Sequence, residues 1–207
     1  MNIIKPAVII EDDIDPERII KNIERAGRVC YKSENRIEDG TAEKFISGIL
    51  KRGHESVIEH EKITVRIICD RGVTHEIVRH RIASYSQEST RYCNYVNDKF
   101  GSQLTFIRPC FWDDEKDRQK LEVWKSSMQN IEDEYFKLIE LGAKPEEARS
   151  ILPNSLKTEI VVTMNMREWR HFLKLRTAAA AHPQMREVAN IILEKFKAFL
   201  PVLFGDI

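Results

Sequence analysis

Hydrophobic residues in this chain follow two spacings, one typical of strands and one typical of helices. In residues 63–69 they fall at every second position, which predicts a strand, and shorter apolar runs predict strands at 7–10 and 159–164. Asp15, Pro16 and Glu17 supply an N-cap, a first-turn proline and an acidic first turn, so they predict a helix start. Helical spacing then predicts helices near 16–30, 42–52, 73–83, 113–141, 145–152, 166–177 and 185–199.

The longest predicted helix, at 113–141, carries a hydrophobic seam spaced three and four residues apart. Such a seam is either core within one domain or a contact between subunits, with a coiled-coil dimer as the sharper alternative. The seam residues are Leu121, Trp124, Met128, Ile131, Tyr135 and Leu138.

Helices and strands are intermixed without a regular βαβ repeat, which favours an α+β fold over a doubly wound sheet. A chain of 207 residues can form one sizeable core, so we predict a single domain over residues 1–207. Neither a G-x-G-x-x-G nor a G-x-x-x-x-G-K-[ST] motif is present. A bound nucleotide cofactor is therefore expected to be held by side chains and helix ends.

Composition narrows the class of protein. Lysine plus arginine equals aspartate plus glutamate at 33 each, which argues against a general nucleic-acid or membrane surface. No apolar run is long enough for a membrane span, and the first residues lack a signal-peptide pattern, so we expect a cytoplasmic protein. The four cysteines form no C-x-x-C motif and are expected to be free, buried thiols rather than zinc ligands or disulfides.

One stretch, residues 79–91, is cationic although the chain has no net charge. It reads Arg-His-Arg-Ile-Ala-Ser-Tyr-Ser-Gln-Glu-Ser-Thr-Arg, with four serine or threonine side chains and one carboxylate. Ile77, Val78 and Ile82 suit a helix that ends near Ala83, followed by a polar loop. Arginine forks, hydroxyls and backbone amides together bind phosphate, so we expect an anion here; the alternative is a solvated helix end and loop.

Two other segments raise chemical alternatives. Residues 54–60, His-Glu-Ser-Val-Ile-Glu-His, invite a metal interpretation, but the spacing is not H-E-x-x-H, and we favour capping and hydrogen bonding with no metal. Pro109-Cys110-Phe111 differs from the P-C-H of the classical thymidylate synthases, so Cys110 is predicted to be core rather than a nucleophile.

The complete pattern R-H-R-x-x-S-x-x-x-x-S-x-R in residues 79–91 resembles the signature of the flavin-dependent thymidylate synthases, the ThyX family. The resemblance continues through His54-Glu55-Ser56, through Arg149 to Pro153, and through the segment 165–176, and covers roughly residues 40–195. It implies a homotetramer with active sites shared between subunits, and FAD, NADPH and 5,10-methylenetetrahydrofolate used to methylate dUMP to dTMP. No nucleic acid or membrane partner is expected.

The resemblance also assigns residues by position. The positions that match flavin contacts, called here the flavin set, are Ser56, Arg79, His80, Arg81, Asn165, Arg167 and His171. The positions that match those around dUMP, called the nucleotide set, are Glu76, Arg79, Gln87, Ser89, Thr90, Arg91, Arg149 and Arg176. His54 matches a residue beside the route taken by folate and nicotinamide. The chain departs from the family pattern at Ser86, Gln87 and Thr90, where Asn, Glu and Gly are common.

Carbon 5 of uracil becomes nucleophilic only when negative charge can develop on the ring. We therefore predict that the Arg176 guanidinium is the catalytic electrophile. Ser89, the second catalytic candidate, has no histidine in an obvious triad relation, so we expect it to position substrate by hydrogen bonding. Arg91 and Arg149 are expected to hold the nucleotide phosphate, Arg79 and Arg81 to serve the flavin, and His80 to pack against or hydrogen-bond the cofactor.

Two hypotheses from other functional classes are alternatives to the enzyme hypothesis. An RNA-binding or single-strand-binding module could use the basic stretch and its neighbouring tyrosines, but no RRM, KH or OB pattern is present. A helical oligomerisation protein could be built on the seam in residues 121–138.

Overall fold

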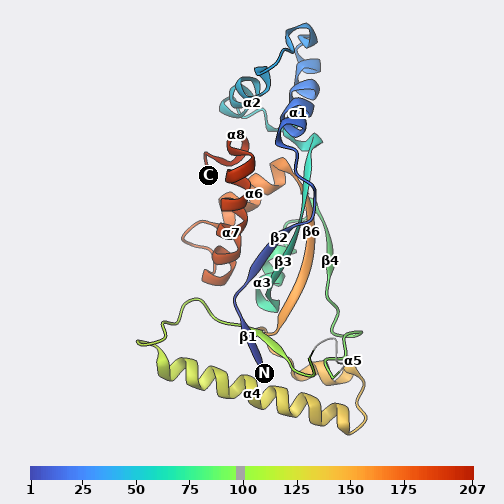
Figure 1. Cartoon of the computed structure of the whole chain (residues 1–207), viewed down its shortest axis with the longest axis vertical. Helices are drawn as coiled ribbons and strands as arrows, with labels where there is room; N and C mark the ends of the chain where they lie inside the picture. Colours follow the sequence, from blue (N-terminus) through green and yellow to red (C-terminus); the bar gives the residue numbers. More distant parts are fainter. Residues whose placement is uncertain (97–100) are drawn as a thin grey trace. The chain divides into compact units, whose positions relative to one another are not determined.

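The computed structural model of this chain describes residues 1–96 and 101–207. Helices and strands are mixed along the chain, which confirms the predicted α+β class (Figure 1). The chain forms two compact units: unit 1 comprises Met1–Ala7, Ile67–Arg79 and Ser86–Ile160, and unit 2 comprises Val8–Arg66, His80–Tyr85 and Val161–Ile207. That the whole chain is a single domain stays a prediction.

The helices and strands are as follows. The α-helices are α1 (Pro16–Cys30), α2 (Thr41–Lys51), α3 (Arg71–Ile77), α4 (Arg118–Glu140), α5 (Pro145–Ala148), α6 (Met166–Arg176), α7 (Pro183–Phe199) and α8 (Pro201–Phe204). The strands are β1 (Asn2–Ile4), β2 (Ala7–Ile10), β3 (Lys62–Asp70), β4 (Ala83–Gln87), β5 (Thr105–Ile107) and β6 (Lys157–Asn165). Short 3₁₀ helices are η1 (Glu34–Arg36), η2 (Glu55–His60) and η4 (Arg149–Ile151).

The strands form two sheets. Four strands are ordered β2-β3-β6-β4, and β1 pairs in parallel with β5. Within the described ranges, no helix has the length and apolar character needed to cross a membrane.

The core of unit 2 is built around α6. This helix begins directly after β6, because the Asn165 side chain accepts the backbone N–H of Glu168 at 2.9 Å and so caps the first turn. Its side chains Trp169, Phe172 and Leu173 are all buried. Trp169 packs edge-on against Phe196 of α7, with ring centroids 5.3 Å apart, and donates its indole N–H to the Ile63 carbonyl at 2.9 Å. Strand β3 and helices α6 and α7 are thereby held together.

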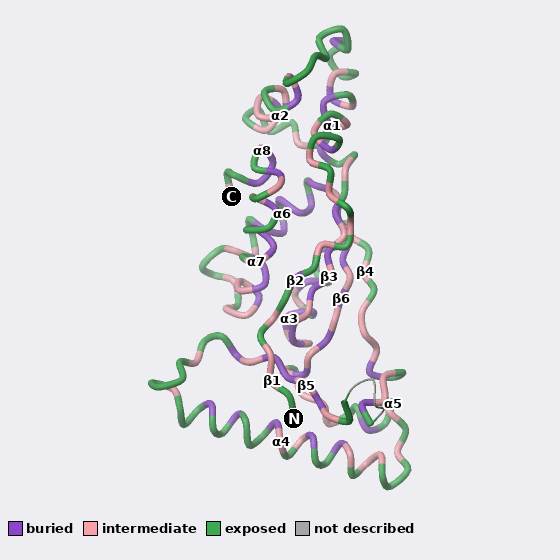
Figure 2. Tube along the Cα trace, in the orientation of Figure 1, coloured by how far each residue is buried: buried purple, intermediate pink, exposed green. Residues whose placement is uncertain are grey.

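The core of unit 1 is built around α4, whose seam packs within the same unit. Trp124, Met128 and Tyr135 share one hydrophobic cluster with Phe106 of β5 and with Leu156, the residue before β6. Figure 2 shows buried positions recurring along one side of α4. The seam is therefore part of the core of unit 1, which was one of the two predicted alternatives; the other was a contact between subunits. The helix begins at Arg118 and not near residue 113, since Asp113 accepts the backbone N–H groups of Glu115 and Lys116 in a local turn.

The helix before the basic stretch ends earlier than predicted. Helix α3 ends at Ile77, and Ala83 begins strand β4. Val78 and Ile82, which suggested a longer helix, are 41% and 67% exposed, so they do not form a buried helical face. At the far end of β4 the backbone N–H of Glu88 donates to the Glu159 carbonyl at 2.8 Å. Pairing with β6 therefore decides the conformation of the stretch, and the expected polar loop is partly a strand.

All four cysteines are free, as predicted, but the predicted burial holds only for Cys69. It is buried, and burial raises the pKa of its thiol. Cys30 and Cys110 are exposed, so the expected inward position of Cys30 on α1 and the core role of Cys110 are wrong. The loop-rich stretch before Cys110 also contains strand β5, which was not predicted, while its residues 97–100 lie outside the described residues.

Candidate functional site

One face of α6 carries three residues spaced four apart, Glu168, Phe172 and Arg176. Four residues correspond to slightly more than one helical turn, so these side chains lie above one another along the same side of the helix. His80, which follows α3 in the sequence, packs against this side. Its ring centroid lies 4.8 Å from that of Phe172, at an interplanar angle of 62°. The buried imidazole is therefore held against the middle of the face.

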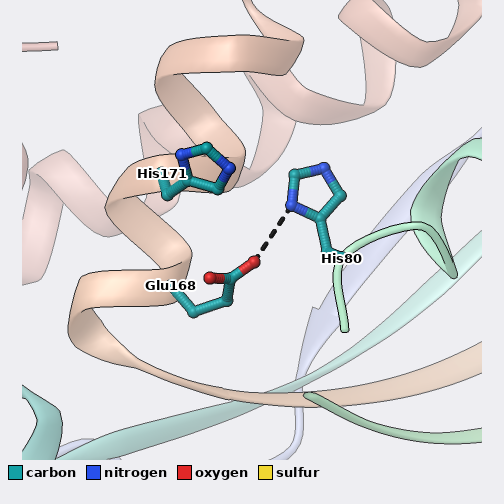
Figure 3. A group of neighbouring side chains, drawn as sticks. All are labelled: His80, Glu168 and His171. Carbon is teal, nitrogen blue, oxygen red and sulfur yellow. Dashed lines mark hydrogen bonds and ion pairs between the residues drawn. The ribbon is translucent and has the colours of Figure 1, made fainter. Parts of the chain in front are cut away.

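Both nitrogens of the His80 ring are hydrogen-bonded. Nδ1 lies 3.1 Å from Oε1 of Glu168, as Figure 3 shows, and Nε2 lies 3.1 Å from Nε of Arg176. An arginine Nε–H can only donate, so Nε2 of His80 accepts, and the ring proton belongs on Nδ1, which donates to Glu168. Carboxylate, imidazole and guanidinium thus form a continuous chain that we call the relay, Glu168–His80–Arg176.

The electrostatics of His80 agree with a neutral ring. The pKa of His80 is lowered below its usual value, and burial is the largest cause of this shift. The hydrogen bond to Glu168 acts in the opposite direction and raises the pKa. The positive charge of Arg176 lowers the pKa further. Beside the ring, the Tyr85 hydroxyl donates to the His80 backbone carbonyl, and burial raises the pKa of Tyr85 to about 12.

His80, Glu168 and His171 also have the proximity of a metal site, with potential ligand atoms within 4.8 Å of one another (Figure 3). The Arg176 guanidinium beside His80 places a fixed positive charge where a cation would compete. We therefore interpret the group as hydrogen-bonded.

The segment 54–60, which raised a metal alternative in the sequence, forms η2 and pairs with other elements of unit 2. Glu59 accepts from Arg167 at 2.6 Å, and His54 Nδ1 lies 2.8 Å from the Tyr31 hydroxyl. Among the described residues, none from this segment belongs to a group of three clustered ligand side chains. These contacts fit the hydrogen-bonding interpretation.

A pocket of about 440 Å³ opens beside α6 in unit 2. Three of its lining residues, Asn165, Arg167 and His171, belong to the predicted flavin set. His80 of the same set lies behind the pocket in the relay, where its ring is 5.5 Å from that of His171. The full lining comprises Glu55, Glu59, Ile82, Asn165, Arg167, Glu168, Arg170, His171 and Lys174.

The other members of the flavin set are not in this lining. Ser56 and Arg81 are exposed residues of unit 2. Arg79 is also exposed, and it is the last residue of the segment Ile67–Arg79 of unit 1. Four of the seven predicted flavin residues are thus gathered around α6, and three are not.

Arg170 is a pocket residue that the sequence did not single out. Its side chain is 2% exposed, pairs with both Asp206 carboxylate oxygens at 2.7 Å, and donates to the Leu203 carbonyl. These contacts tie α6 to the segment after α8, so Arg170 stabilises the fold of unit 2.

Most of the predicted nucleotide set lies in unit 1. Gln87 donates its amide N–H groups to Thr74 at 3.1 Å and Thr158 at 3.3 Å, which ties β4 to α3 and β6. A glutamate, common here in the family, could accept hydrogen bonds from both hydroxyls but could not donate to them. This departure therefore reverses the direction of two internal hydrogen bonds.

Ser89 and Thr90 shape the turn that follows β4. Ser89 Oγ accepts the backbone N–H of Arg91 at 3.3 Å, as in a serine turn, and its positioning of substrate stays a prediction. Thr90 is buried. Its φ is not positive, so the backbone conformation does not require the glycine that is common in the family.

The arginines predicted to hold phosphate lie on the surface of unit 1. Arg91 is 53% exposed, lies over the Tyr92 ring at 5.3 Å, and is 3.9 Å from a Glu146 oxygen. Arg149 is exposed in η4, and Glu76 is half-buried in α3. Both guanidinium groups are thus presented to solvent, unlike that of Arg176 in unit 2.

Glu168 is the residue that sequence reasoning missed. One carboxylate in a first helical turn is commonly explained by the helix dipole. The only available signal was its spacing of four and eight residues before Phe172 and Arg176. Its pairing with His80, 88 residues away in sequence, required the folded chain.

Comparison with known proteins gives consistent matches. Residues 11–202 match the family model described as thymidylate synthase complementing protein. A flavin-dependent thymidylate synthase of Pyrococcus furiosus is 43% identical over 170 residues, covering 82% of this chain and 68% of that protein. The Geobacter sulfurreducens protein of the same name is 36% identical over 205 residues, covering 96% of this chain and 84% of that protein.

Among solved structures, a UMP/dUMP methylase from Streptomyces cacaoi bound with 5-Br dUMP has the same fold, with a TM-score of 0.80. The match covers 99% of this chain and 96% of that one at 23% sequence identity.

Proposed function

Because this chain belongs to the family of flavin-dependent thymidylate synthases, we propose a complete reaction and a set of residue roles for it. The chain is an enzyme that uses a flavin and methylates dUMP to dTMP. In our proposal the flavin is FAD, 5,10-methylenetetrahydrofolate gives the carbon, NADPH gives the reducing equivalents, and tetrahydrofolate is released. The observation that carries the residue roles is the relay, which holds Arg176 on α6 and whose carboxylate, Glu168, lines the pocket.

The pocket beside α6 fits a flavin nucleotide in chemistry. Its volume of about 440 Å³ is within the usual range for ligand pockets, ~300–1,000 Å³. Arg167 and Lys174 in its lining would pair with a diphosphate by exchanging their present partners, Glu59 and Glu55. Asn165 and His171 offer further polar groups. When bound, the flavin would supply the redox chemistry. We assign Asn165, Arg167, His171 and His80 to hold it, with Ser56, Arg79 and Arg81 as outlying contacts.

Arg176 is proposed as the electrophilic group for the uracil ring. Negative charge on the ring oxygens and N3 makes carbon 5 nucleophilic, and a nearby guanidinium stabilises that charge before carbon 5 attacks. Since Nε of Arg176 is bonded to His80, the terminal amino groups of the fork would meet the substrate. Preorganised donors of this kind typically contribute about 3–4 kcal/mol to the lowering of the barrier.

The nucleotide itself is proposed to be bound by the other members of the nucleotide set. Arg91 and Arg149 hold the phosphate through charge-assisted hydrogen bonds. Ser89 and Thr90 position the nucleotide from the turn after β4, and Glu76, Gln87 and Arg79 complete the contacts. His54, exposed at the start of η2, is proposed to lie beside the path of folate and nicotinamide.

The active enzyme is proposed to be a homotetramer whose active sites are shared between subunits, and to work in the cytoplasm. Support for the tetramer comes from the family resemblance. Light scattering of the purified protein should give about four times the chain mass of 24.2 kDa. A monomer that is fully active would contradict shared active sites.

The decisive experiment is reconstitution with omissions. Purified protein should show flavin absorbance bands and form dTMP from dUMP, NADPH and 5,10-methylenetetrahydrofolate. Omitting each component in turn should stop the reaction. A colourless protein that FAD does not reconstitute, or turnover without the folate, would contradict the proposal.

A further inference from the structure

The relay contains a residue to which the proposed function gives no role, Glu168. It is 8% exposed, and the His80 ring that it contacts is 5% exposed, so water has little access to their hydrogen bond. Asn165 fixes the backbone of Glu168 by capping α6, which limits where the carboxylate can lie. Glu168 is therefore both buried and oriented.

Only one arrangement of protons satisfies every member of the relay. With the proton on Nδ1, His80 donates to Glu168, and its Nε2 accepts from Arg176. With the proton on Nε2, two N–H donors would face each other across 3.1 Å, and the carboxylate would face a lone pair. The negative charge of Glu168 selects the first arrangement, because it attracts the Nδ1 proton.

From this geometry we propose that Glu168 is a positioning residue of the enzyme, which keeps His80 in the Nδ1–H tautomer and thereby fixes the orientation of the Arg176 guanidinium. The inference rests on the proposed electrophilic role of Arg176. Glu168 acts through His80 and not on the substrate. Its effect should therefore appear mainly in kcat, when charge develops on the uracil ring, rather than in dUMP binding.

The first test is the substitution Glu168→Gln, which preserves size but removes the charge. The amide can also turn its NH₂ toward Nδ1 and favour the wrong tautomer. We expect kcat to fall by roughly 10- to 100-fold, as for other residues that orient a functional histidine, with the KM for dUMP changed less than about threefold. The matched control is Glu194→Gln, an exposed glutamate on α7 whose replacement should leave kcat unchanged.

A double-mutant cycle separates positioning from a direct structural or flavin contact. Arg176→Lys keeps the positive charge but removes the Nε–H that His80 accepts. In that background, Glu168→Gln should cost less than about twofold in kcat, because its effect passes through the lost hydrogen bond. Equal losses in both backgrounds would overturn the inference while leaving the role of Arg176 intact. Arg176→Lys and Arg176→Ala variants that both turn over like the parent enzyme would instead overturn the proposed function.

Direct observation of the ring does not depend on activity. In protein labelled with ¹⁵N in histidine, the two nitrogens of His80 should show a protonated Nδ1 and an unprotonated Nε2, and this pattern should change in Glu168→Gln. Thermal unfolding of each variant verifies that it folds. An Nε2–H tautomer in the parent protein, or no change on substitution, would overturn the inference.

Discussion

The predicted site residues lie in two regions, and the arginines of these regions differ in burial and in hydrogen bonding. On α6, Arg176 is half-buried and bonded to a buried histidine, which is bonded in turn to a buried carboxylate. In the turn after β4 and in η4, Arg91 and Arg149 are exposed, and the ion pair of Arg91 with Glu146 spans 3.9 Å. The first arrangement fixes one charge in place, whereas the second leaves two charges on long, mobile stems.

This difference indicates a division of labour. A charge that stabilises a transition state must already be oriented when the reaction occurs, because reorientation would cost energy at that moment. A charge that captures a phosphate can remain solvated until the ligand arrives, and it contributes to affinity. Substitutions in the two regions should therefore have different kinetic signatures.

The largest effect is expected from Arg176→Ala. Loss of the oriented guanidinium should reduce dTMP formation by about 10²- to 10³-fold. Flavin absorbance should be retained, since the pocket beside α6 keeps its lining. Single-turnover measurement of dTMP with bound flavin quantified in the same sample provides the check. If Arg176→Ala turned over within tenfold of the parent enzyme, the oriented Arg176 would not differ in catalytic importance from the exposed arginines of unit 1.

Arg170→Ala should mainly affect stability. Arg170 is buried and paired with the half-exposed Asp206, so its removal should lower the free energy of unfolding by about 2–3 kcal/mol. The measurement is denaturant unfolding monitored by tryptophan fluorescence. The matched control, Lys195→Ala, removes an exposed cation of α7 and should change stability by about 0.5 kcal/mol at most. Equal effects of the two substitutions would show that the contacts of Arg170 contribute little.

Arg91→Ala and Arg149→Ala should each raise the KM for dUMP by about tenfold and change kcat by less than about threefold. Each removes a charge-assisted hydrogen bond to the phosphate from an exposed position. Steady-state kinetics at low ionic strength gives both constants, and Lys125→Ala, an exposed cation on α4, serves as the control. If kcat fell and KM stayed constant, the exposed arginines would act in the chemical step, against the division of labour.

The smallest effect is a dependence of stability on pH. The pKa of His80 is lowered in the folded protein, chiefly by burial, while the unfolded value is about 6.5. Between these two values the unfolded chain binds more protons, so stability is complete above about pH 6.5 and declines as the pH falls toward the folded pKa. Glu168, Arg176 and His171 are the charged or titratable groups that face the ring.

Unfolding curves between about pH 7.5 and 5 should reveal this decline in the parent protein. In His80→Gln the part of the slope due to His80 should disappear. Identical slopes for the two proteins would mean that His80 keeps an ordinary pKa and that the relay does not hold it neutral.

Local signals in the sequence predicted much of the fold. The α4 seam, the start of α1 and the alternating burial of β3 follow from spacing and capping chemistry, and the structure confirms each. The Asp15 side chain, for example, accepts the backbone N–H of Arg18 at 3.0 Å. The end of α3 and the start of β4 were not predictable in this way. They depend on pairing with β6, about 70 residues farther along the chain, which overrides the local preference of Val78 and Ile82.

For the candidate site too, the sequence indicated some residues, whereas the contacts between them appear only in the structure. The family pattern indicated His80 and Arg176 individually, but their hydrogen bond spans 96 residues and appears only in the folded chain. Glu168 belongs to none of the motifs found in the sequence. An acidic residue near a helix start is also commonly explained by the helix dipole. Sequence thus predicted which residues carry charge, and the structure revealed which of those charges are held in a fixed orientation.

The spacing of Glu168, Phe172 and Arg176 makes α6 intolerant of changes in length. Inserting or deleting one residue between positions 168 and 176 would rotate one end of the helix by about 100° relative to the other, so the two ends could no longer meet the same imidazole. Neither substitution nor repacking of the core would repair that loss of phase. Surface loops generally tolerate insertions, whereas the hydrogen bonds at both ends of this interval require its eight-residue spacing.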